Sequence, residues 1–104
     1  MSLDIWLTAV RPTQVFDANI THNVSAMWRK AGIHDALYES KDKTAAEVLP
    51  ELRTGLMLMR DDPDGFRALN PPNGWGDYDS ALKWLETLIA AFEECPDGVI
   101  GVWA

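Results

Sequence analysis

The chain has 104 residues, 47% of them apolar and 24% charged, which is enough to bury one core and predicts a single domain over residues 1–104. Its formal net charge is −7, and no more than two Lys or Arg residues are adjacent, which disfavours binding to a nucleic-acid polymer or to an anionic membrane surface. A single cysteine, Cys95, excludes an intramolecular disulfide.

Two segments near the ends of the chain are predicted to be strands. Apolar and polar residues alternate from Leu3 to Val10, and Gly98 to Trp103 is a short β-branched segment that follows the turn sequence Pro96-Asp97-Gly98. The alternation in the first segment puts on one face Leu3, Ile5, Leu7 and Ala9. Because two strands alone are marginally stable in water, we expect them to pair as a ribbon with helices on one face, a ribbon that dimerisation could extend.

The region between these strands has helical patterns. Apolar residues recur at three- and four-residue spacing, and Thr44, Asp62 and Asp77 are suited to cap the last three predicted helices. The predicted helical segments are 20–31 with a further turn at 34–39, then 44–59 with Pro50 inside it, 62–69, and 77–94. The sequence therefore predicts an α+β fold of order β-α-α-α-β, in which two terminal strands are covered by three to four helices.

A proline- and glycine-rich polar loop precedes the last predicted helix. Residues 70–77 have the sequence NPPNGWGD, in which prolines fix φ, glycines permit close backbone approach, and asparagine amides donate and accept hydrogen bonds. Such a loop can hold a ligand through Asn70, Asn73 and Trp75. The alternative is that the loop only forms a tight connection and that Trp75 fills the core.

Polar side chains also crowd the entrance to the first predicted helix. Asn19 and Thr21 are natural helix caps, so initiation of the helix explains part of this polarity. It does not explain His22 and Asn23, which are therefore candidate ligand-binding residues together with the two caps. The alternative for His22 is a half-buried packing role, which is the commoner one for a histidine at this position.

The motifs ITHN at 20–23 and NPPNGWG at 70–76 carry a family resemblance. With them, the chain from about Asp4 to Trp103 resembles a small family of uncharacterised proteins from bacteria and their tailed phages. The family has no established activity, so the resemblance implies a bacterial or phage context and no mechanism. No signal-peptide pattern or long apolar span is recognised, so a cytoplasmic location is expected.

The favoured functional hypothesis is non-catalytic binding of a small polar ligand, with nucleotide-derived compounds as a candidate class. Trp75 and Tyr78 could stack on a planar ring, and Arg67 or Arg11 could meet an anion. In the context of a phage, such a protein could sequester a host defence signal. No cofactor, metal-ligand set or catalytic residue is predicted, and an enzyme that uses His22 as general base ranks last because no nucleophile or cofactor motif accompanies it.

The alternative hypothesis is a protein-interaction or assembly module. Five tryptophans is a large number for 104 residues, and Trp6 and Trp103 lie in the predicted terminal strands. A two-stranded ribbon leaves strand edges open for pairing with another chain. Formation of a homo-oligomer through the ribbon is compatible with either hypothesis.

Overall fold

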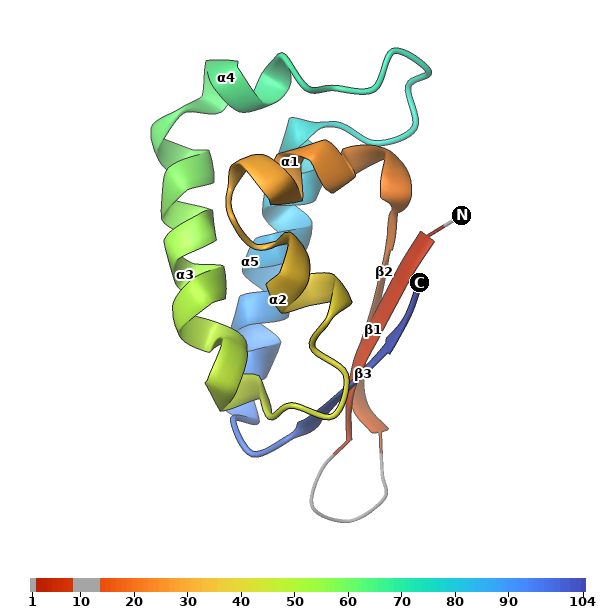
Figure 1. Ribbon diagram of the computed structural model, residues 1–104, viewed down its shortest axis with the longest axis vertical. Helices are drawn as coiled ribbons and strands as arrows, with labels where there is room; N and C mark the ends of the chain where they lie inside the picture. Colours follow the sequence, from red (N-terminus) through yellow and green to blue (C-terminus); the bar gives the residue numbers. More distant parts are fainter. Residues whose placement is uncertain (1, 9–13) are drawn as a thin grey trace.

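The protein has an α+β fold in which a three-stranded antiparallel sheet packs against a layer of helices (Figure 1). The computed structural model describes residues 2–8 and 14–104. The strands are β1 (Ser2–Thr8), β2 (Gln14–Thr21) and β3 (Val99–Trp103), and their order is β2-β1-β3. The first strand is therefore the central one, and it pairs with the next strand on one side and with the last strand on the other.

The helices lie on one side of the sheet (Figure 1). They are the 3-10 helix η1 (His22–Val24) and the α-helices α1 (Ser25–Lys30), α2 (His34–Tyr38), α3 (Ala45–Asp61), α4 (Pro63–Arg67) and α5 (Tyr78–Glu94). The two long helices, α3 and α5, pack against each other. Of the helices in the described ranges, none combines the length and the apolar character that crossing a membrane requires.

Alternation along β1 decides which face of the sheet the helices cover. Leu3, Ile5 and Leu7 are completely buried, and the residues between them are partly exposed. Ile20 of β2 and Ile100 of β3 are paired with Leu3 and Leu7 and are buried on the same face. Each such side chain contributes about 1.5–3 kcal/mol by leaving water, so this inner face anchors the sheet to the helical layer.

The helix caps follow the pattern that the sequence predicts. The carboxylate of Glu47 accepts the backbone N–H of Thr44 at 2.7 Å, and α3 continues through Pro50. Asp62 accepts the N–H of Gly65 at the start of α4. Asp77 accepts the N–H of Ser80 at 2.7 Å at the start of α5, and this hydrogen bond lowers the pKa of its carboxyl group.

The predicted layout is correct in part. The α+β class is confirmed, and the terminal strands β1 and β3 do pair, in antiparallel register. The prediction of a two-stranded ribbon is wrong because residues 14–21 form a third strand, and the order β-α-α-α-β is incomplete because five α-helices follow β2. Ile20 and Thr21, predicted to open a helix, end this strand. The predicted strand residues Ala9 and Val10 lie outside the described residues.

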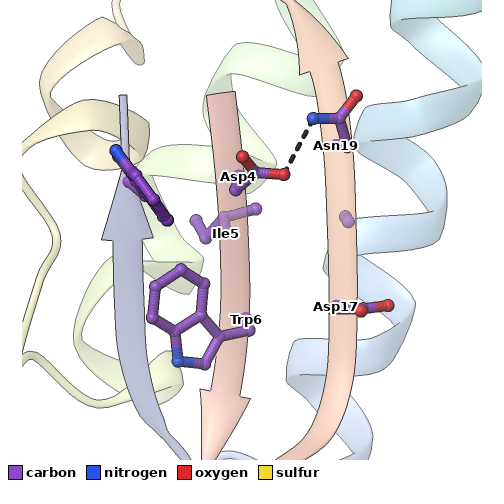
Figure 2. Close-up of a pocket in the computed structure, with 7 residues that line it drawn as sticks. Asp4, Ile5, Trp6, Asp17 and Asn19 are labelled. Atoms are coloured by element: carbon purple, nitrogen blue, oxygen red, sulfur yellow. Dashed lines mark hydrogen bonds between the residues drawn. The ribbon is translucent and has the colours of Figure 1, made fainter. Parts of the chain in front are cut away.

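Trp6 lies on the outer face of the sheet, the face away from the helices. It is paired with Gly101 of β3, and a Cβ atom built on that glycine would overlap the six-membered ring and the Nε1 atom of the indole. Figure 2 shows the Trp6 ring turned toward β3. The absence of a side chain at position 101 therefore lets the indole lie flat on the sheet.

We expect Gly101→Ala to lower the free energy of unfolding by about 1 kcal/mol, because the new methyl group displaces the indole of Trp6. In a Trp6→Ala background the same substitution should be neutral or stabilising, since alanine has less backbone entropy to lose than glycine. Urea unfolding of the two single variants and the double variant measures this difference. An equal cost in both backgrounds would show that the indole does not occupy this position.

Candidate functional site

The two polar segments singled out in the sequence lie side by side at one end of the sheet. β2 ends at Thr21 and continues into η1, and the loop of residues 70–77 runs past this junction. A Cβ atom on Gly76 would lie 2.9 Å from Cγ2 of Thr21 and 2.9 Å from Cγ1 of Val24, and the φ of Gly76 is +94°. Both the close approach and the backbone conformation favour glycine, which lets the loop lie against the end of the strand.

An open hollow of about 650 Å³ lies between the two segments, and we call it the amide hollow. Its lining comes from β1, β2, η1 and the loop, and consists of Ser2, Asn19, Thr21, Asn23, Asn73 and Trp75. Five of the nine residues predicted to bind a ligand are therefore brought together around one space. Their side chains are amides, hydroxyls and an indole, which suit hydrogen bonding to a polar ligand.

Local hydrogen bonds fix the lining. Asn73 accepts the backbone N–H of Trp75 at 3.0 Å, and Thr21 accepts that of Asn23 at 3.3 Å. The amide nitrogen of Asn19 donates to the hydroxyl of Ser2 at 2.9 Å and to the carboxylate of Asp4 at 2.8 Å.

Several polar atoms of the lining remain available after these bonds form. Among the described residues, the carbonyl oxygen of Asn19, the amide nitrogen of Asn73 and the whole side-chain amide of Asn23 take part in no further hydrogen bond. They provide both donors and acceptors, so one ligand could bond to several of them at once.

Trp75 is 69% exposed, so it does not fill the core. The alternative prediction, in which the loop is only a connection and Trp75 fills the core, is therefore wrong about Trp75. An exposed indole at the rim of a polar hollow offers a flat apolar surface beside hydrogen-bonding groups, and a planar ligand can use both.

Asn70 and Tyr78 belong to the framework that holds the loop. Tyr78 is only 2% exposed, and its hydroxyl donates to the carbonyl of Met59 at 2.6 Å. Asn70 accepts the backbone N–H of Tyr78 at 2.8 Å, which ties the start of the loop to the start of α5. Burial raises the pKa of Tyr78. Since its ring is packed inside, Tyr78 cannot stack on a ligand as the sequence suggested.

The side chain of Arg67 contacts other residues of the protein. Its guanidinium lies 5.0 Å from the centre of the Tyr78 ring and 3.2 Å from the carboxylate of Asp79. It does not line the amide hollow. Arg67 therefore links α4 to the first turn of α5, and Arg11, the other arginine considered for an anion, lies outside the described residues.

His22 points toward α2. Its Nδ1 atom is 2.8 Å from the hydroxyl of Tyr38, whose ring stacks on His34 with centroids 4.3 Å apart. His22 does not line the amide hollow, although its neighbours Thr21 and Asn23 do. This contact matches the packing role that the sequence left open for His22.

The charges around the amide hollow disfavour anions. No Lys or Arg is among its described lining residues, and the nearest carboxylate in the hydrogen-bond network is Asp4, which bonds to Asn19. In residues 2–8 and 14–104, no group of three or more His, Cys, Asp or Glu side chains is arranged to hold a metal ion. The lining therefore suits neutral polar groups.

Ser2 is the lining residue that the sequence did not reveal. It reaches the hollow because it is paired with Thr21 across β1 and β2. Nothing in its local sequence marks it, since its position depends on the register of two strands.

Tyr78→Phe is expected to lower the free energy of unfolding by about 1–2 kcal/mol at pH 7, because the carbonyl of Met59 loses its buried partner. The raised pKa of Tyr78 has a second consequence. Its contribution to stability is complete below the unfolded-state pKa and is lost as the pH rises through the folded-state value. Urea unfolding is measured between about pH 8 and 11, the range around the ordinary pKa of tyrosine. The loss of stability with rising pH should be smaller in the variant.

Some alkaline loss should remain in this variant, because burial also raises the pKa of Tyr38. Identical alkaline profiles for the two proteins would contradict the assigned burial of Tyr78.

Comparison with models of known protein families, with curated proteins and with solved structures gave no match.

Proposed function

We propose that the protein binds a small polar ligand in the amide hollow and that the bound part of the ligand is uncharged and planar, as in a nucleoside. The observation that carries this proposal is the convergence of three asparagine side chains and an exposed indole on one space. Asn19 and Asn23 come from the end of β2 and from η1, and Asn73 and Trp75 come from the loop before α5.

The lining chemistry fits a nucleobase. The edge of a base carries donors and acceptors that an asparagine amide can match in pairs, and its ring can stack on an indole. Stacking of a base on an aromatic side chain contributes about 1–3 kcal/mol in proteins that bind single-stranded nucleic acids. Trp75 is the described lining residue suited to this contact, and Asn23 and Asn73 are suited to the base edge.

Phosphate groups fit the hollow less well. The described lining residues include no cation, and Asp4 lies one hydrogen bond away through Asn19. A nucleotide-derived ligand would therefore be held by its base and sugar, with its phosphates in solvent. Sequestration of a host defence nucleotide, which the resemblance to phage proteins suggests, would depend on these same contacts.

The described lining is suited to binding and not to proton transfer. Ser2, Thr21, the three asparagines and Trp75 do not titrate near neutral pH, and His22 is directed to Tyr38. This absence of a general acid or base in the described lining supports a non-catalytic role.

The proposal predicts that adenosine or guanosine stabilises the protein in a thermal-unfolding experiment. At a ligand concentration of ten times Kd, the gain should be about 1.4 kcal/mol, or about 5–8 °C in Tm for a domain of this size. Trp75→Ala should abolish the gain, because it removes the stacking surface, and Asn73→Ala should reduce it. Trp103→Ala is the matched control, since Trp103 is an equally exposed tryptophan (74%) outside the lining.

The corresponding monophosphates, used at the same concentration, should bind no more tightly than the nucleosides. Two results would count against the proposal: no gain from any nucleoside, or the same gain in the Trp75→Ala variant as in the unaltered protein.

A further inference from the structure

The outer face of the sheet carries a second hollow, of about 460 Å³, which does not depend on the ligand proposed above. We call it the acidic face. Its outward-pointing residues are Asp4 and Trp6 of β1, Asp17 and Asn19 of β2, and Trp103 of β3. Figure 2 shows Asp4 beside Asn19 and the ring of Trp6 lying along the sheet.

The strand register sets aromatic rings beside a carboxylate. Asp4 is paired with Asn19 on one side and with Trp103 on the other, and Trp6 is paired with Asp17 and Gly101. Directly paired side chains have Cβ atoms about 4.5–5.5 Å apart. Asp4 and Trp103 are therefore neighbours across β1 and β3 on the outer face, and Trp6 lies two residues beyond Asp4 along β1.

The charge on this face is unbalanced. The three strands contain Asp4 and Asp17 and no Lys or Arg. Among the described residues neither carboxylate forms an ion pair, whereas each ion pair found joins residues of the helical layer. One oxygen of Asp4 accepts from Asn19, which leaves the other oxygen available. The face is complementary to a cation.

We propose that the acidic face binds an arginine side chain that an extended segment of a partner polypeptide presents. A guanidinium can stack on an indole and at the same time donate to a carboxylate, and it is more weakly hydrated than an ammonium. Trp103 and Asp4 offer these two contacts side by side. Val99, 41% exposed on β3, adds apolar surface along which the flanking residues of the segment can lie.

The size and charge of the face argue against a second copy of this chain. The strands have seven, eight and five residues. At about 3.4 Å per residue and about 4.8 Å between strands, they cover only about 330 Å². A stable interface buries about 800 Å² on each partner. A face-to-face pair would also place Asp4 and Asp17 of the two copies near each other, and each chain already carries a net charge of −7.

The geometry also favours a polypeptide over a free organic cation. The hollow is open, so a lone guanidinium would keep most of its surface in water and gain little. A peptide that crosses the sheet adds contacts on either side of the arginine, with Val99 in one direction and the rim at Asn19 in the other.

The test uses a pentapeptide with a central arginine between threonines, capped at both ends, and the same peptide with citrulline in place of arginine. Citrulline keeps the shape and removes the charge. Titration at low salt is followed through the indole N–H signals of the ¹⁵N-labelled protein. The signals of Trp6 and Trp103 should shift and that of Trp75 should not, and the citrulline peptide should bind about tenfold more weakly, as expected when a charged contact to an aromatic and a carboxylate is lost.

Asp4→Asn and Trp103→Ala should each weaken binding of the arginine peptide about five- to tenfold, and raising the salt concentration should weaken it further. Asp61→Asn is the matched control, because Asp61 is an exposed carboxylate at the end of α3. Trp75→Ala should leave peptide binding unchanged, which separates this site from the amide hollow.

Each of the following results would overturn the proposal. The arginine peptide produces no shifts, or the citrulline peptide binds equally well. A single arginine blocked at its amino and carboxyl groups binds as tightly as the peptide, which would indicate a small organic cation as the occupant. Without peptide, the Trp6 and Trp103 signals depend on protein concentration, and sedimentation detects a dimer that Trp103→Ala abolishes. These two results together would indicate a second copy of the chain as the occupant.

Discussion

Burial of Leu3, Ile5 and Leu7 against the helices is the constraint on which the rest of the structure depends. Because side chains alternate along a strand, a strand that buries these three residues must present Asp4 and Trp6 on its other face. A slip of one residue would exchange the two faces and bury a carboxylate, so the register is strongly determined. The same register pairs Ser2 with Thr21 and Asp4 with Trp103, which places the lining of both hollows.

The parts of the fold that were predictable are those with strong local signals. Tyr78, Ala81 and Leu85 follow the helical period, and the start of α5 at the Asp77 cap could be predicted from the sequence. β2 was missed because its outward residues include Asp17 and Asn19, which have low β-propensity, and these hid the alternation of Phe16, Ala18 and Ile20 on the inner face. Thr21 does cap a helix, as its sequence context suggested, but that helix is the short η1 at the end of a strand.

The candidate site could be predicted only as a set of polar segments. By residue type, Asn70 and Asn73 were equally good candidates for ligand binding. In the structure Asn70 is bonded to the backbone of Tyr78, and of the two only Asn73 lines the amide hollow. Polarity alone does not reveal whether the fold already satisfies a side chain, because the partner can be distant in sequence. The helical period could have resolved one case, since it placed Tyr78 on the buried face of α5 together with Ala81.

Asn19 links the two hollows chemically. Its side chain lines both, and its amide nitrogen donates to Ser2 in one and to Asp4 in the other. A guanidinium at the second oxygen of Asp4 would lie beside the carboxylate that holds this amide, and a ligand bonded to the amide oxygen would contact the same side chain from the other end. Asn19 is thus the side chain that the two linings have in common. For this reason the two sites are best separated through Trp75 and Trp103, which each belong to one hollow.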